Sequence, residues 1–364
     1  MTFEEARAAF PVLERYAYLN AGSVGPLAQR TYDAIVEAGK SELGPRGGLE
    51  QFEQIIEARK GLRQVLGAQV GVSPEQIALT TSTSEACRIV VAGLDLGPED
   101  EIVITDAEHF GLLGPVHASR ARVRVAAVRG RPAAEALGGI LAEIGPRTKL
   151  VALSHVLWLN GHVIPLEELN ATTSAPLLVD GAQSVGAIPV NAEGIDFYTV
   201  SGQKWLCGPT PTGALYVRDP AALRVAGPSY FSQASYEPDG AFVPREGAAR
   251  FEQSWIPAPF IAGLEAALDG LPEWRFERAR EMTDRCRQRL LEAGFEVVTE
   301  PGQGTLVSWR WEGDTTELVK RLYAEDVVIR DLPRTGLLRA SCGYWTSEDD
   351  IDRLVAGLRR SQLG

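Results

Sequence analysis

Residues 177–209 read LLVDGAQSVGAIPVNAEGIDFYTVSGQKWLCGP and contain two short apolar runs, Leu177–Asp180 and Phe197–Ser201. Short runs of β-branched, aromatic and aliphatic residues, bounded by glycine and polar residues, are typical of buried strands. Each run ends in a polar residue, and Lys204 follows the second run after two residues. The segment therefore predicts two strands of one sheet, with an acid and an amine at their carboxyl ends.

Similar patterns continue on both sides of this segment. Further strand-like runs are Glu101–Thr105, Lys149–Leu153 and Gly213–Arg218, and helix-period patterns cover Glu53–Leu66, Ser84–Ala92 and Pro132–Glu143. Strands that alternate with helices are typical of a mostly parallel sheet covered by helices. The sequence therefore predicts an α/β fold.

The pattern changes after residue 256. Two long helices, Phe260–Leu271 and Glu273–Gly294, are followed by shorter strand-like pieces and a closing amphipathic helix, Glu348–Arg360. We expect a large domain over residues 16–256 and a smaller α+β domain from residues 1–15 plus 257–364. The segment Gly227–Gly247 is rich in Gly, Pro and Ser, which predicts a loop that is either exposed or near a site.

Composition limits the classes of function. The chain has 364 residues, of which 45% are apolar and 23% charged, with a net charge of −12. An acidic chain repels nucleic acid and anionic membranes, so neither is expected as a partner. The N-terminus lacks a signal-peptide pattern and no run of about 18 apolar residues occurs, so we expect a cytoplasmic protein without membrane spans. The cysteines and histidines show no metal-ligand spacing, and no metal is expected.

A hydroxyl-rich turn, Thr80–Ala86, lies between an apolar run and an amphipathic helix. A helix N-terminus offers free N–H groups and a positive dipole end, and hydroxyls add further donors. The turn could therefore hold a phosphate, although an ordinary Ser/Thr helix cap would also explain it.

Asp180 and Lys204 are the second and third pieces of a possible site. An acid at the carboxyl end of a buried strand lies where open α/β sheets bind ligands, and it could pair with a protonated pyridine nitrogen. A lysine at a desolvated strand end forms Schiff bases readily, because burial lowers its pKa. A helix cap for Asp180 and an exposed turn for Lys204 are the alternatives.

Together these pieces resemble the class V aminotransferase family of pyridoxal 5′-phosphate (PLP) enzymes, which includes cysteine desulfurases, isopenicillin N epimerase and cyst(e)ine lyases. The resemblance spans nearly the whole chain and is closest in motifs to the cyst(e)ine lyase branch. The matching segments include Tyr18–Gly22, Glu108-His109, Ser154–Gly161, Lys204–Pro209 and Arg339–Ser341. It implies fold type I with a seven-stranded type of sheet, bound PLP, an amino acid substrate and a homodimer with active sites at the subunit interface.

The resemblance also implies roles for individual residues. Lys204 would be the catalytic lysine that binds the cofactor. The other cofactor contacts would be Asp180 at the pyridine nitrogen, Gln183 at the ring oxygen, His109 stacked on the ring, and Thr83, Ser84 and Ser201 at the phosphate. The substrate would be held by Arg339, which matches the arginine that clamps its carboxylate, together with Arg330 and Asn20.

Four positions depart from the desulfurase pattern. No cysteine lies between Arg330 and Arg339, where desulfurases carry their persulfide-forming residue, so a persulfide relay is disfavoured. Gln203 stands where many relatives have histidine, and Trp158 replaces an asparagine. In the loop that usually crosses between subunits, only Ser254 could contribute a hydroxyl.

The sequence thus predicts a PLP-dependent C–S β-lyase that acts on cysteine, cystine or a related thio amino acid, since β-elimination needs no catalytic cysteine. An aminotransferase or epimerase of the same fold is the second interpretation. A non-catalytic PLP-binding protein is the third.

Overall fold

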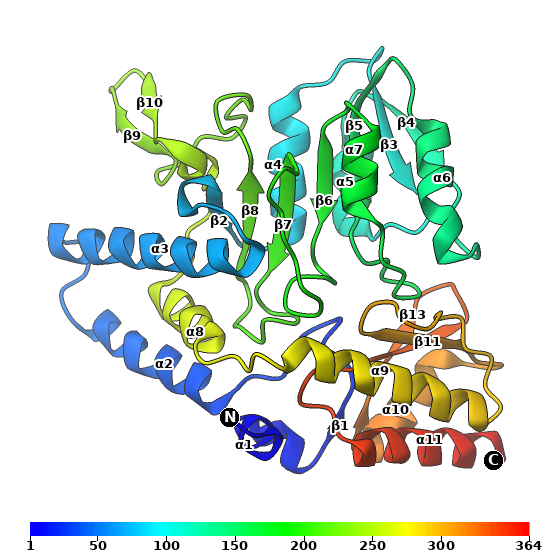
Figure 1. Cartoon of the computed structure of the whole chain (residues 1–364). Coiled ribbons are helices and arrows are strands. Elements are labelled where there is room, and N and C mark those ends of the chain that lie inside the picture. The colour runs from blue at the N-terminus through cyan, green and yellow to red at the C-terminus, as the bar shows by residue number, and fades with distance from the viewer. Residues whose placement is uncertain (364) are drawn as a thin grey trace.

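The computed structural model describes residues 1–363, and its centre is a seven-stranded sheet (Figure 1). The strands, in spatial order, are β2 (Ile77–Thr80), β8 (Gly213–Val217), β7 (Phe197–Ser201), β6 (Leu177–Asp180), β5 (Thr148–Ser154), β3 (Glu101–Thr105) and β4 (Arg122–Ala126). Only β8 runs antiparallel to its neighbours, β2 and β7. The sheet is therefore mostly parallel, as expected, and β3, β6 and β7 have the predicted bounds.

Helices cover both faces of this sheet. The helices of the chain are α1 (Phe3–Ala8), α2 (Gln29–Gly39), α3 (Leu49–Val70), α4 (Thr83–Leu94), α5 (Phe110–Ala118), α6 (Ala133–Glu143), α7 (Leu166–Thr172), α8 (Ala258–Leu268), α9 (Arg275–Glu292), α10 (Thr315–Ala324) and α11 (Glu348–Leu363). Neighbouring residues of one strand face opposite sides, so Val179 packs in the core under α3, α6, α7 and α8, whereas Leu178 packs under α4 and α5. Burial on both faces explains why these strands read as continuous apolar runs.

The C-terminal part has its own small sheet and core. Strands β11 (Leu306–Arg310), β14 (Leu337–Ser341) and β13 (Arg330–Leu332) form an antiparallel sheet, and α9, α10 and α11 supply apolar residues to the core beside it. Strand β1 (Ala17–Tyr18) pairs with β12 (Val327–Val328), while α8 shares its core with the large sheet. The domain boundaries at 15/16 and 256/257 stay predictions.

Two expectations differ from the structure. The segment 227–247 is not entirely loop, because it contains a hairpin of β9 (Gln233–Tyr236) and β10 (Phe242–Pro244) that projects from the body (Figure 1). Helix α8 ends at Leu268, before Gly270 with φ +63° and Pro272, neither of which continues a helix readily. No helix within residues 1–363 is long and apolar enough to cross a membrane.

Candidate active site

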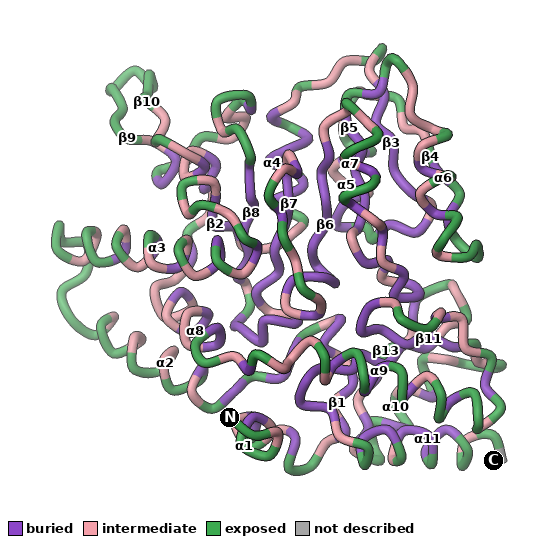
Figure 2. Tube along the Cα trace, in the orientation of Figure 1, coloured by how far each residue is buried: buried purple, intermediate pink, exposed green. Residues whose placement is uncertain are grey.

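The carboxyl ends of the buried strands β5, β6 and β7, which are mostly purple in Figure 2, meet at one edge of the sheet. A small cavity lies at this edge and is lined by His109, Ser154, Val156, Trp158, Asp180, Ala182, Gln183 and Lys204. The fold thus brings together four of the predicted cofactor residues, which are up to 95 positions apart in the sequence (His109 to Lys204).

Asp180 keeps one carboxylate oxygen free. Its side chain is buried, and Oδ1 accepts hydrogen bonds from the Ala182 N–H at 2.9 Å and the Thr199 hydroxyl at 3.2 Å. Oδ2 accepts no hydrogen bond from residues 1–363. Turns rather than a helix follow β6, so the helix-cap alternative is wrong. The free oxygen suits a protonated ring nitrogen.

Lys204 lines the cavity and is half-buried, without a carboxylate in salt-bridge contact among residues 1–363. Burial is the main cause that lowers the pKa of its amine, to about 8. The charge of Asp180 opposes this shift, whereas Arg339 and Arg330 add to it. An appreciable fraction of the amine is therefore neutral, and hence nucleophilic, near neutral pH.

The hydroxyl-rich turn combines a helix cap with unused hydroxyls. Ser82 is the N-cap of α4, because its Oγ accepts a hydrogen bond from the Glu85 N–H at 3.2 Å. Thr83 and Ser84 are the first residues of α4, and their hydroxyls make no hydrogen bond within the described chain. The buried Ser201 hydroxyl at the end of β7 is similarly unused there. These three hydroxyls are thus available for an anion.

His109 is the N-cap residue of α5, and its ring packs edge-on against Trp158 with centroids 5.3 Å apart. Its Nδ1 accepts a hydrogen bond from the Gly111 N–H at 3.1 Å, which places the proton of the neutral ring on Nε2. Partial burial is the first cause that lowers the pKa of His109, and the charge of Lys204 is the second. A neutral ring at this position can stack on a planar ligand.

The side chains of Gln183 and Asn20 already have partners. Gln183 donates from Nε2 to the Gly22 carbonyl at 2.8 Å and accepts at Oε1 from the Trp205 indole at 3.0 Å. One N–H of its amide is still unused. Asn20 Oδ1 accepts from the Ser23 hydroxyl at 2.8 Å, so its amide NH₂ is the group free to contact a substrate.

Arg339 is a buried cation without an anion. It is 2% exposed, donates from Nη1 to the Trp158 carbonyl at 2.9 Å, and leaves Nε without a partner. Burial, followed by the charge of Arg330, lowers the pKa of Arg339 to about 9. Neither arginine forms a salt bridge within residues 1–363, so both guanidinium groups are available to an anion.

Sequence reasoning missed Ser23 and Glu108 as functional candidates. Glu108 is buried and accepts from the Thr105 hydroxyl and from both the N–H and hydroxyl of Ser154, which lines the cavity. Burial raises the pKa of Glu108 to about 7, and the nearby charge of Asp180 adds to the shift. The Glu108-His109 dipeptide was the available sequence signal, but nothing in it indicated contact with β5.

All four cysteines, Cys87, Cys207, Cys286 and Cys342, are free and buried. Burial raises the pKa of Cys207, the one closest in sequence to Lys204. A buried thiol of high pKa is a poor nucleophile. No cluster of three metal-ligating side chains occurs in residues 1–363.

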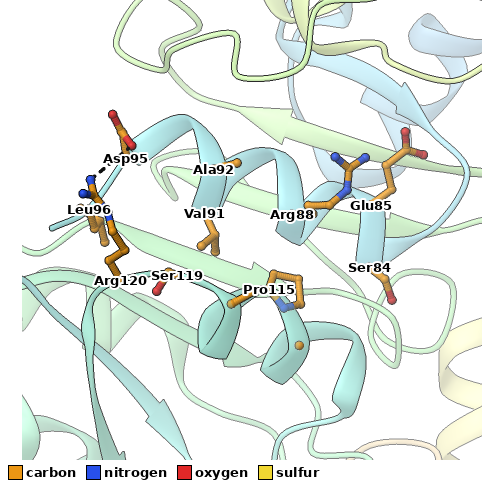
Figure 3. Close-up of a pocket in the computed structure, with 12 residues that line it drawn as sticks. Ser84, Glu85, Arg88, Val91, Ala92, Asp95, Leu96, Pro115, Ser119 and Arg120 are labelled. Carbon is orange, nitrogen blue, oxygen red and sulfur yellow. Dashed lines mark ion pairs between the residues drawn. The ribbon is translucent and has the colours of Figure 1, made fainter. Parts of the chain in front are cut away.

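A groove of about 640 Å³ leads away from the hydroxyls at the start of α4 (Figure 3). It begins at Ser84, runs between α4 and α5 past Val91 and Pro115, and ends near Arg120. The proposed phosphate position is therefore open on the side of these two helices.

Comparison with known proteins assigns the chain to a family. The model of the family described as aminotransferase class-V matches residues 31–354. Isopenicillin N epimerase from Streptomyces clavuligerus is 28% identical over 98% of this chain and 97% of its own. A probable cysteine desulfurase from Mycolicibacterium paratuberculosis is 37% identical over 85% of this chain and 49% of its own. A solved structure of the cystine C–S lyase C-DES with its product, cysteine persulfide, has a TM-score of 0.88 at 28% identity and covers 96% of this chain and 98% of that one.

The chain belongs to the aminotransferase class-V family, a family of PLP-dependent enzymes. The expected family, fold class, enzyme class and cofactor are therefore confirmed. The roles of the individual residues stay predictions.

Proposed function

We propose that this protein is a C–S β-lyase that acts on cysteine, cystine or a related thio amino acid. The observation that carries the proposal is an unpaired arginine pair beside the Lys204 cavity, combined with four cysteines that are all buried. This combination suits elimination, which needs a carboxylate clamp and a base but no reactive thiol.

The side chains in the cavity fit PLP. Lys204 would bind its aldehyde, Asp180 Oδ2 its ring nitrogen, and the spare N–H of Gln183 its ring oxygen. His109 would cover the ring, and Thr83, Ser84 and Ser201 would hold the phosphate. When bound, the cofactor supplies a conjugated ring that accepts electron density from the Cα atom of the amino acid.

Residues of the chain would bind the substrate and transfer its Cα proton. Arg339 and Arg330 would hold the α-carboxylate, and Asn20 lies beside them. Holding the carboxylate in this way fixes the direction of the Cα–H bond. The amine of the substrate would displace Lys204, and the freed amine of Lys204 would then take the Cα proton. The Cβ–S bond breaks with its electron pair going to sulfur, so cysteine releases sulfide and cystine releases cysteine persulfide. The aminoacrylate that remains reacts with water to give pyruvate and ammonia.

The test is to incubate the PLP-loaded protein with L-cysteine and L-cystine and to measure pyruvate, ammonia and the sulfur product. We expect all three from at least one of these compounds, and none from Lys204→Ala. Lys149→Ala is the matched control, because Lys149 is exposed on β5. PLP-loaded protein that forms no pyruvate from any cysteine derivative would contradict the proposal.

An epimerase is the second candidate, because isopenicillin N epimerase matches over 98% of this chain. Removal and return of the Cα proton would need the same lysine and the same carboxylate clamp. Loss of Cα chirality without pyruvate formation would identify an epimerase, and stoichiometric keto-acid exchange would identify an aminotransferase. Binding of PLP without turnover of any amino acid would indicate the non-catalytic alternative.

We also propose that the chain acts as a homodimer, in the cytoplasm. Large apolar side chains are exposed beside a cavity of about 910 Å³ at the start of α3, including Leu49 at 75% and Trp255 at 59% exposure. Apolar surface of this kind marks protein interfaces. Light scattering should give twice the chain mass of 39.3 kDa. A monomer at concentrations where the enzyme is active would contradict the dimer.

A further inference from the structure

The turn Asn20–Gly25, between β1 and α2, contacts each part of the site. Its Gly22 N–H donates to the Ser341 hydroxyl at 3.1 Å, two residues beyond Arg339. Its Gly25 N–H donates to the Gln203 carbonyl at 2.8 Å, next to Lys204. The turn therefore links the arginine strand to the lysine.

Gly22 leaves room for the Arg339 guanidinium. A Cβ atom at position 22 would lie 2.7 Å from Nη2 of Arg339 and 2.9 Å from the Ser341 hydroxyl, closer than real Cβ contacts. Arg339 cannot easily yield, because it is buried and its Nη1 is held by the Trp158 carbonyl. Nη2 has no hydrogen-bond partner in the described chain, so it is the nitrogen that can receive an anion.

Ser23 holds the second arginine. The Arg330 Nη1 donates to the Ser23 hydroxyl at 3.1 Å, and that hydroxyl donates to Asn20 Oδ1 at 2.8 Å. Arg330 is otherwise exposed and makes no other side-chain hydrogen bond within residues 1–363. The relay Arg330–Ser23–Asn20 therefore orders a long side chain that would otherwise sample many rotamers.

We propose that the turn Asn20–Gly25 positions both arginines to bind the α-carboxylate of an amino acid. Ser23 acts as a positioning residue for Arg330. Gly22, which has no side chain, leaves Nη2 of Arg339 accessible to the carboxylate. The inference rests on the proposed function, because it takes an amino acid as the ligand. It concerns binding of the carboxylate rather than the bond that is broken afterwards.

The probe is L-alanine, which has the amine and the carboxylate of a substrate but no leaving group at Cβ. Four variants are titrated with it in the PLP-loaded state, with the change in visible absorption as the readout: Ser23→Ala, Ser23→Thr, Gly22→Ala and Gly138→Ala. Gly138→Ala is the matched control, since a Cβ at this exposed position in α6 meets no atom within 4 Å. Melting temperature without the cofactor, and the unliganded absorption spectrum, are recorded for each variant.

We expect the half-saturating alanine concentration to rise about 3- to 10-fold in Ser23→Ala, and about 10- to 100-fold in Gly22→Ala, where a bond to a charged group is lost. Ser23→Thr keeps the hydroxyl and should bind like the unchanged protein, as should Gly138→Ala. The unliganded spectrum should match the control in all variants. The melting temperature should match it in Ser23→Ala and Ser23→Thr, whereas Gly22→Ala should lower it, because its Cβ would lie against the buried Arg339 side chain. With a cysteine derivative, Ser23→Ala should raise KM and leave kcat unchanged.

Unchanged alanine binding in Ser23→Ala and Gly22→Ala would overturn the inference. So would a lowered melting temperature of Ser23→Ala beside its loss of binding, which would indicate a structural role, or no response of the unchanged protein to either alanine or cysteine. If the variants follow the expected pattern but no cysteine derivative yields pyruvate, the lyase proposal fails and the inference about the turn holds.

Discussion

Arg330 on β13 and Arg339 on β14 are directly opposite each other in the antiparallel register, and neither is paired with a carboxylate in residues 1–363. Like charges directly across a strand pair are destabilising, and an unpaired buried charge costs more. The fold therefore maintains an unfavourable charge arrangement that a bound carboxylate would relieve.

Replacing Arg339 with methionine should weaken amino acid binding and raise the stability of the protein. We expect Arg339→Met to lose measurable amino acid binding while its free energy of unfolding rises by about 1–3 kcal/mol, because a buried unpaired charge is removed. Chemical denaturation and alanine titration test this. Arg321→Met, at an exposed position of α10, should change neither quantity. Lower stability together with intact binding would contradict the assignment of an anion site.

Loss of the negative charge of Asp180 should lower kcat more than it lowers the amount of bound PLP. Asparagine keeps the hydrogen bonds to Ala182 and Thr199 but cannot stabilise a positive ring nitrogen, so we expect kcat of Asp180→Asn to fall roughly 100-fold or more. Pyruvate formation and PLP absorbance are measured together. Asp349→Asn, exposed in α11, is the control. An Asp180→Asn enzyme with full kcat would show that no charge is needed at this position.

The lowered pKa of Lys204 predicts how PLP uptake depends on pH. The rate at which cofactor-free protein takes up PLP should rise with pH, and the midpoint of the rise should lie near pH 8, above which the neutral amine is the major form. Arg339 lowers this pKa, so Arg339→Gln should shift the rise to higher pH. Comparing the two proteins cancels the titration of PLP itself. A rise centred near pH 10 in the unchanged protein, as for an ordinary lysine, would refute the prediction.

Glu108 should make stability depend on pH. Its folded pKa of about 7 lies above the unfolded value, so the native state holds a proton that the unfolded chain releases between about pH 4.5 and 7. Stability should therefore fall as pH rises through this window, by up to about 3 kcal/mol from this group.

Glu108→Gln should flatten this slope, whereas Glu167→Gln, exposed in α7, should leave it unchanged. The measurement is the slope of the unfolding free energy against pH. A single stability value would not suffice, because a glutamine amide also perturbs the hydrogen bonds to Thr105 and Ser154. Equal slopes in Glu108→Gln and the unchanged protein would contradict the raised pKa.

Local sequence predicted β3, β5, β6, β7 and β8 of the large sheet because these strands are almost entirely buried on both faces. Leu177–Asp180 and Phe197–Ser201 have the predicted bounds for this reason. Local sequence did not predict β2, nor β4, which is only partly buried. The hairpin at 233–244 was missed because β9 and β10 are exposed for most of their length and carry no apolar alternation.

The site residues that lie at or just after the carboxyl end of a predicted strand, such as Asp180 and Lys204, could be predicted from the sequence. The site was not predictable where function depends on contacts across the chain. Ser23 and Arg330 are 307 positions apart, and Glu108 meets Ser154 across 46 positions. Such contacts depend on strand order and register, which a single sequence does not encode locally.

Lys204 is the residue that we propose binds the cofactor, and it is one of five lysines in the chain: Lys40, Lys60, Lys149, Lys204 and Lys320. The direct measurement is borohydride reduction of the PLP-loaded protein, followed by peptide mass spectrometry. We predict the pyridoxyl modification on the peptide that contains Lys204 and on no other lysine. Modification at one of the other four lysines instead, or at none, would contradict the account.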